Sequence, residues 1–135
     1  MLRQPKKTKY NKYFKPRRLP QSWNKMKELQ PMLTYSLVAL ESSFINYSQI
    51  EAARQIIRRT IKRRGKLEIY VLPDIGISNK SSGARMGKGK GKVKRWVGSV
   101  AAGKTVFKLI GIKRSEAILA LKKGANKLPL AFRVC

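Results

Sequence analysis

Glycine and cationic residues alternate in one internal segment of this 135-residue chain, residues 85–92. Glycine allows positive φ angles and lets the backbone approach a partner closely, whereas the lysines between the glycines repel one another and cannot pack into a core. A row of phosphates would stabilise such a segment, and the alternative is a solvated linker. The segment consists of Arg85, Met86, Gly87, Lys88, Gly89, Lys90, Gly91 and Lys92.

Residues suited to catalysis are scarce. The chain has no histidine, which is the commonest general base and metal ligand, and its single cysteine, Cys135, forms neither an intrachain disulfide nor a zinc cage. The six carboxylates show no catalytic pairing, and the glycine spacing over 87–91 matches no nucleotide-binding fingerprint. We therefore predict a protein that is not an enzyme and has no cofactor, no metal site and no small-molecule substrate.

The composition favours a polyanionic partner. Lysine and arginine number 32 against 6 acidic residues, so the net charge is +26. Self-repulsion of this size opposes a compact free monomer, and nucleic acid would relieve it by neutralising charge and releasing counterions. An anionic membrane is the second candidate. An apolar fraction of 42% indicates a protein core instead, and no run approaches the roughly 18 apolar residues of a membrane span.

The chain divides into a basic arm over residues 1–31 and one domain over 32–135. Aromatic residues alternate with cations in the arm. Cations bind phosphates, and aromatic rings stack on bases or seat the arm on its own domain, whereas a disordered tail is the alternative.

Periodicity predicts an α+β fold in which two helices pack on a mixed or antiparallel sheet. A capping box from Ser48 to Glu51 begins the first helix, which is expected to reach about Arg64 before Gly65 stops it. The second helix opens at Ser115. Strands are expected over 34–40, 67–72 and 130–134, a hairpin over 94–101 and 105–110, and a long loop over 75–92.

The first predicted helix has an aliphatic inner face and an arginine-rich outer face. Such a charged face is usually only solvated. Here Arg54, Arg58 and Lys62 are spaced for i,i+4 repulsion, and no acidic residue follows Glu51 in the helix. Tolerance of that repulsion favours a surface that faces phosphates.

Several ordered segments together resemble the ribosomal large-subunit protein L-sixteen family of bacteria and organelles. A Gly/Arg-rich stretch of that family has no counterpart in residues 16–47, which contain no glycine. The similar segments are residues 1–2, 5–9, 49–54, 63–66, 71–74, 85–91, 96–97 and 127–129.

The resemblance implies a non-catalytic α+β protein on large-subunit rRNA, beside the aminoacyl-tRNA path and near the peptidyl transferase region. It implies that other large-subunit proteins are neighbours, that the first helix faces rRNA, and that residues 85–92 reach toward the functional centre and aminoacyl-tRNA. The cations expected to bind rRNA are Lys6, Lys7, Lys9, Lys12, Arg17, Arg18, Arg54, Arg58, Arg59, Lys62, Arg63, Arg64 and Lys66.

Composition also suggests a compartment. The start shows no transit peptide, and the chain is rich in lysine, isoleucine and asparagine, which indicates an organelle-encoded protein of the mitochondrial ribosome. The alternative is the cytoplasm of a bacterium. A different class, an architectural DNA-binding protein, shares the charge but would need a groove-reading motif that the sequence does not display.

We expect the free protein to fold poorly or to aggregate at low ionic strength, because the +26 charge is then unscreened. Thermal melts of purified protein across a salt series measure this. A cooperative melt at low salt, together with an arm that resists protease, would contradict the expectation.

Overall fold

The computed structural model describes residues 5, 7–10, 12, 14–16, 33–87 and 89–135. The boundary expected between residues 31 and 32 lies outside these ranges. The elements are β1 (Thr34–Ala39), β2 (Ser43–Asn46), α1 (Tyr47–Thr60), β3 (Lys66–Ile69), β4 (Ile75–Asn79), β5 (Lys92–Val100), β6 (Thr105–Ile110), α2 (Arg114–Ala125) and β7 (Phe132–Val134).

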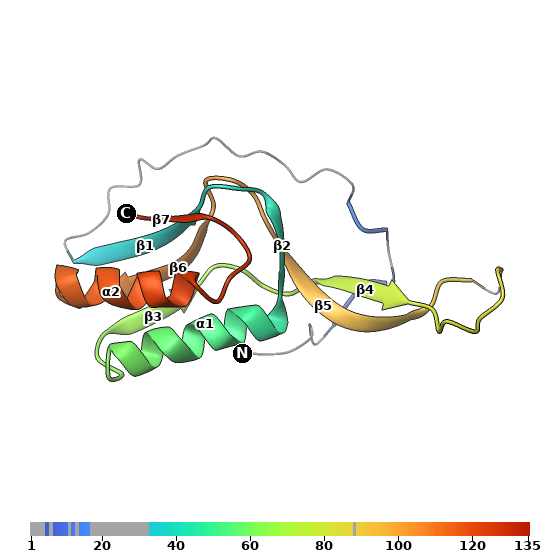
Figure 1. Cartoon of the computed structure of the whole chain (residues 1–135), viewed down its shortest axis with the longest axis horizontal. Coiled ribbons are helices and arrows are strands. Elements are labelled where there is room, and N and C mark those ends of the chain that lie inside the picture. The colour runs from blue at the N-terminus through green and yellow to red at the C-terminus, as the bar shows by residue number, and fades with distance from the viewer. Residues whose placement is uncertain (1–4, 6, 11, 13, 17–32, 88) are drawn as a thin grey trace.

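The strands form two antiparallel sheets, which confirms the predicted α+β class. One sheet has the order β3-β6-β1-β7 and the other the order β2-β5-β4. The helices α1 and α2 pack on each other, and α2 also packs on β1 and β7 (Figure 1). The larger sheet and the two helices make the body of the molecule.

The core of the body contains the inner face predicted for the first helix and the apolar face of α2. Ile50, Ala53 and Ile57 of α1 are fully buried, as are Ala117 and Leu121 of α2. These side chains pack with Leu37 and Phe107 of the sheet in one continuous cluster. The apolar spacing therefore identified the faces that hold the body together.

The predicted hairpin is wrong, because β5 and β6 lie in different sheets. The backbone at the turn between them bonds to β1 instead. The amide of Gly103 donates to the Ala39 carbonyl at 2.7 Å, and the Ala39 amide donates to the Lys104 carbonyl at 3.0 Å. These bonds place β6 beside β1 and leave β5 to pair with β2 and β4.

The predicted loop over 75–92 is too long, since residues 75–79 form β4 and pair with β5. The segment follows Pro73 and contains Gly76, two residues that usually argue against a strand. Gly76 is accommodated because the side chains of Val93 and Trp96 fill the space beside it. Together β4 and β5 form a twisted ribbon that extends from the body and ends in the loop of residues 80–91 (Figure 1).

The ribbon contains a β-bulge. Ile77 pairs with Arg95 and Ser78 pairs with Val93, so Lys94 has no partner on β4. A bulge of this kind bends the strand and increases its twist.

Both ends of α1 differ from the prediction. Asn46 is the N-cap, its amide donates to the Gln49 side chain at 2.9 Å, and Ser48 lies inside the helix. The helix ends at Thr60, where the amides of Lys62 and Arg63 donate to the carbonyls of Arg59 and Arg58 in a Schellman arrangement. Lys62 therefore occupies the left-handed position, with a φ of 49°, that Gly65 was expected to supply.

The two sheets meet where β5 crosses the segment that links β3 to β4. A Cβ atom on Gly98 would lie 2.6 Å from a Val71 methyl group and 2.7 Å from the Leu72 carbonyl oxygen. Only glycine permits this approach without a shift of the backbone.

We expect Gly98→Ala to lower the free energy of unfolding by about 1–3 kcal/mol, because the added methyl group overpacks the crossing. Gly83→Ala is the matched control, since nothing lies within 4 Å of its Cβ position, and it should change stability by less than about 0.5 kcal/mol. Urea unfolding of both variants in high salt measures the difference, and equal effects would show that the crossing tolerates a side chain.

Candidate nucleic-acid interface

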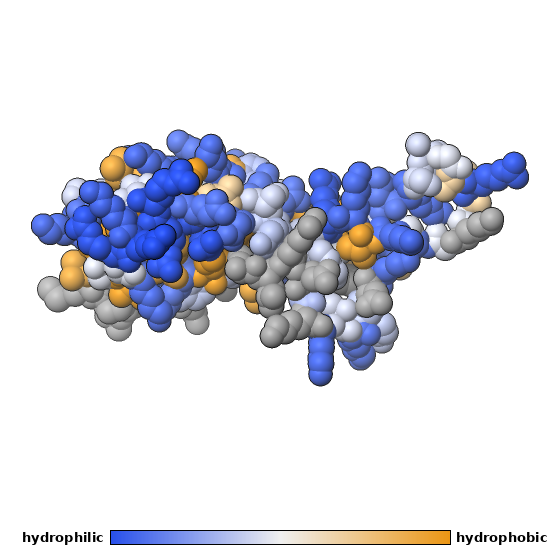
Figure 2. Space-filling model, turned by 90° about the horizontal axis from the view of Figure 1, so that it is seen from below, coloured by the Kyte–Doolittle hydropathy of each residue, from blue (hydrophilic) through white to orange (hydrophobic). Residues whose placement is uncertain are grey.

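The outer face of α1 and the turn that follows it carry a row of exposed cations. Arg58, Arg59, Lys62 and Arg63 are all exposed, and with Arg54 and Gln55 they line a concavity. Figure 2, which views the molecule from the α1 side, shows hydrophilic residues gathered over this end. The structure thus brings together all five cations predicted for this face, Arg54 included.

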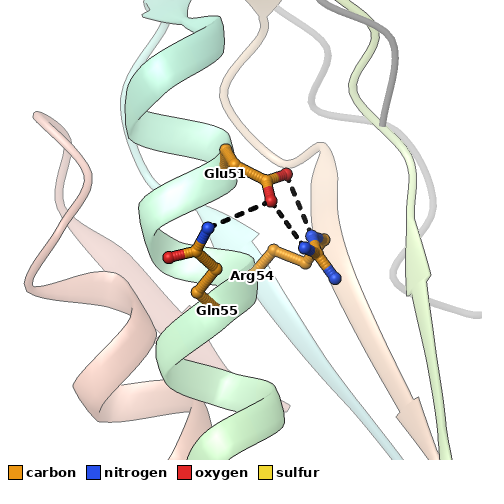
Figure 3. Close-up of polar contacts among 3 residues, drawn as sticks. All are labelled: Glu51, Arg54 and Gln55. Atoms are coloured by element: carbon orange, nitrogen blue, oxygen red, sulfur yellow. Dashed lines mark hydrogen bonds and ion pairs between the residues drawn. The ribbon is translucent and has the colours of Figure 1, made fainter.

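Arg54 differs from the rest of the row because it is paired with Glu51. Its Nε donates to Glu51 Oε2 at 2.9 Å, its Nη2 forms an ion pair with Oε1, and Gln55 donates to Oε1 at 3.3 Å (Figure 3). The hydrogen bonds from Arg54 lower the pKa of the Glu51 carboxyl, although burial opposes them, and the same pairing raises the pKa of Arg54. No acidic residue follows Glu51 in the helix, but Glu51 itself pairs with Arg54, so Arg54 is not left to the i,i+4 repulsion expected from the sequence.

Two further predicted cations also have carboxylate partners. Arg64 lies 3.9 Å from Glu116, which links the turn after α1 to the first turn of α2. Lys66 lies 2.7 Å from Glu68, which also accepts a 2.9 Å hydrogen bond from the Tyr70 hydroxyl. Hydrogen bonds from Lys66 and then Tyr70 lower the pKa of Glu68.

The pairing sorts the predicted residues of this region into two groups. Arg54, Arg64 and Lys66 are partly neutralised by neighbouring carboxylates. The residues of the second group form no ion pair within the described part of the chain. We call this group the α1 cation row: Arg58, Arg59, Lys62 and Arg63.

The Gly/Lys segment lies in the loop at the far end of the ribbon (Figure 1). Lys80 reaches across the loop and donates to the Gly87 carbonyl at 2.7 Å. Positive φ angles of 91° and 74° at Gly87 and Gly89 turn the chain, and Gly91 passes so close to the Asn79 carbonyl that a Cβ would clash with it. The glycines therefore shape the loop as their spacing suggested.

The described residues of the Gly/Lys segment are largely exposed. Met86 is 99% exposed, and the other predicted loop residues that are described are exposed or half-buried. Lys88 lies outside the described residues. The described members of the predicted set are Arg85, Met86, Gly87, Gly89, Lys90, Gly91 and Lys92.

Part of the arm contacts the domain, a possibility that the interleaved aromatic residues had suggested. Lys12 donates to the Lys90 carbonyl at 2.9 Å, and the ammonium of Lys15 lies 4.5 Å from the ring centroid of Phe44. Lys15 is one of the arm cations that alternate with aromatic residues, whereas Phe44 and Lys80 were not singled out in the sequence, because nothing local marks residues so far apart as neighbours. Lys7 and Lys9 are exposed, and Lys6, Arg17 and Arg18 lie outside the described residues.

The described residues also bear on other functions. They contain no group of three or more histidine, cysteine, aspartate or glutamate side chains placed to hold a metal ion. Neither α1 nor α2 has the length and apolarity needed to cross a bilayer.

The comparison with known families defines the class of protein. Residues 5–135 match the family described as ribosomal protein L16p/L10e. The chain belongs to this family, as its ordered motifs predicted, and membership in a family of ribosomal structural proteins confirms that it is not an enzyme.

Similar curated proteins carry the name large ribosomal subunit protein uL16. The protein of Caulobacter vibrioides is 42% identical over 130 residues, covering 96% of this chain and 90% of its own length. The protein of Fusobacterium nucleatum is 41% identical over 130 residues, with 96% and 90% covered, and that of Erythrobacter litoralis is 43% identical over 131 residues, with 97% and 90% covered.

We expect the pairing of Glu51 with Arg54 to make stability depend on pH. Because the folded-state pKa of Glu51 is lowered, its contribution is fully present above the ordinary glutamate pKa of about 4.3 and is lost as the pH falls through the folded-state value. At pH 7, Glu51→Gln should cost about 0.2–1 kcal/mol, and the gap to the wild type should narrow as the pH falls below the ordinary glutamate pKa of about 4.3.

Urea unfolding of the wild type, Glu51→Gln, Arg54→Gln and the double variant at pH 7 and pH 3.5 would measure this coupling. A gap that is the same at both pH values would show that the carboxylate charge contributes nothing.

Proposed function

We propose that this protein is a structural constituent of the large ribosomal subunit and binds large-subunit rRNA, with other large-subunit proteins as neighbours. Family membership and the printed names of the relatives support the assignment to that subunit. The observation that carries the binding proposal is the α1 cation row, four exposed cations that have no ion pair within the described part of the chain and lie together on one surface.

The chemistry of the row suits an RNA backbone. Arginine guanidinium groups bind phosphate through two parallel hydrogen bonds, and each phosphate neutralised releases counterions. The inner face of α1 is buried in the core, so the row is presented on a rigid support. The row is flanked by Arg54, Arg64 and Lys66. The positive charges of these three residues are partly neutralised by their carboxylate partners.

The loop of residues 80–91 is proposed as a second contact. The ribbon carries it away from the body, so the loop can enter a crevice that the body cannot (Figure 1). We propose that it reaches toward the aminoacyl-tRNA path near the peptidyl transferase region. Arg85 has a particular role in this proposal, because its planar guanidinium can grip a phosphate or stack on a base in ways that lysine cannot reproduce.

The arm over residues 1–31 is proposed as a third rRNA contact, joined to a domain over residues 32–135. Lys7 and Lys9 support this proposal, since both are exposed. Lys6, Arg17 and Arg18 belong to the same proposal on the grounds of sequence alone.

There are two proposals for the compartment in which this protein works. The mitochondrial ribosome rests on composition, whereas the bacterial relatives support a bacterial cytoplasm equally well. The location of the reading frame decides between them: mitochondrial DNA would support the first and a bacterial chromosome the second.

We expect replacement of Arg58, Arg59, Lys62 and Arg63 by glutamine to weaken binding to a large-subunit rRNA transcript and to flatten its salt dependence. The slope of log K against log salt should fall by about 3, since each lost phosphate contact contributes about 0.7–0.9. Filter binding across a salt series measures the slope, and sedimentation of extract shows whether the variant still enters the large subunit.

The matched control replaces Lys113, Lys122, Lys123 and Lys127 by glutamine, which removes the same charge from exposed positions in and around α2. A control that flattens the slope as much as the row variant would show that only net charge matters. If sedimentation of the protein with large complexes in extract were sensitive to DNase and not to RNase, the result would instead support the architectural DNA-binding alternative.

A further inference from the structure

The described residues of the arm lie beside the β4–β5 ribbon and contact its loop (Figure 1). Two of these contacts converge on Lys90. The ammonium of Lys12 donates to the Lys90 carbonyl at 2.9 Å, and the ammonium of Lys90 lies 5.0 Å from the ring centroid of Phe14. The returning limb of the loop is thus held through both its backbone and its side chain.

The arm touches the smaller sheet at a second place. The ammonium of Lys15 lies 4.5 Å from the ring centroid of Phe44, which belongs to β2. Because β2 pairs with the body end of β5 and Lys90 lies two residues before the other end, the arm contacts the smaller sheet near both ends of its longest strand. A segment fixed at two such points limits how far the loop can swing relative to the sheet.

These contacts join two segments of like charge without any carboxylate. The sequence has no acidic residue in positions 1–16 and none between Asp74 and Glu116. Carbonyl oxygens and the faces of aromatic rings are then the electron-rich groups that can attract an ammonium group. The arm supplies a ring to the loop, and the loop supplies a carbonyl to the arm.

Phe14 is 92% exposed, so its contact with Lys90 does not depend on burial in the core. The same holds for Lys12, which is also exposed. Substitution of either side chain should therefore act on the loop and leave the folding of the body unchanged.

We propose that Lys12 and Phe14 are positioning residues that hold the loop of residues 80–91 in its extended orientation before any RNA is bound. This role goes beyond rRNA binding by the arm, because it is exerted on the protein itself. It orders the loop in advance and so lowers the entropy lost when the loop meets its partner.

A nitroxide label on the loop tests the proposal in the full chain. Cys135 is the only cysteine, so Ser82→Cys in a Cys135→Ser background gives one labelled site on the exposed part of the loop. Spectra are recorded without RNA, at about 0.5 M salt to screen self-repulsion. The test pair is Lys12→Met with Phe14→Leu.

The matched control is Lys9→Met with Tyr10→Leu. It removes the same charge and one aromatic ring from the same arm. The contact that it removes lies within the arm, since the ammonium of Lys9 lies 5.6 Å from the Tyr10 ring centroid. Thermal melts of both variants check that the body remains folded.

We expect the ratio of slowly to rapidly moving label to fall about two- to fivefold in the test pair, which corresponds to the strength of an exposed cation–π contact. The control pair should match the unsubstituted protein, and all melting temperatures should agree. An unchanged ratio in the test pair, or an equal fall in both pairs, would overturn the proposal. Because RNA is absent, either outcome leaves the rRNA-binding proposal to its own experiment.

Discussion

Repulsion among 32 cationic side chains is the constraint under which every other contact in this molecule forms. With only six carboxylates, the chain can neutralise few of these charges internally. The acidic residues seen in ion pairs, Glu51, Glu68 and Glu116, all lie in the body. They lie on α1, on β3 and where the turn after α1 meets the first turn of α2.

The ribbon has no such carboxylates and folds by other means. Its strands are held by backbone pairing and by the side chains around Gly76, while its loop is shaped by glycines and by ammonium groups that bind carbonyl oxygens. This division of chemistry matches the division of the molecule. An apolar core overcomes repulsion in the body, and local bonds direct an exposed segment whose charge is left available for an anionic partner.

Elements with a clear period were predictable, since their pattern reports burial directly. Ile50, Ala53 and Ile57 marked the inner face of α1, and the cations that remained defined the outer face. The short strands β2 and β4 were missed, because four or five residues carry little periodicity and Gly76 weakened the signal further. The hairpin failed for a different reason: Gly103 does mark a turn, but its backbone bonds to the distant Ala39.

The residues of the candidate interface were also predictable only where a local pattern marked them. Residue type and helical spacing located the α1 cation row, whereas the pairing of Arg64 with Glu116 depends on where α2 packs and has no local signature. The contact between Lys12 and Lys90 joins residues 78 positions apart, so only the assembled fold reveals it.

The pairing of β4 with β5 around the bulge at Lys94 limits how the length of the ribbon can vary. Side chains alternate between the two faces of a ribbon, so the number of facing pairs between the body and the loop determines which face each loop residue occupies. Removal or addition of one facing pair of residues would turn the loop residues to the opposite face, whereas removal or addition of two pairs would change the length and preserve their faces. Loss of Lys94 alone would remove the bulge and its local bend, but Val93 would still face Ser78 and Lys92 would still face Asn79, so the loop would keep its faces. Variation in this ribbon is therefore constrained by parity more than by size.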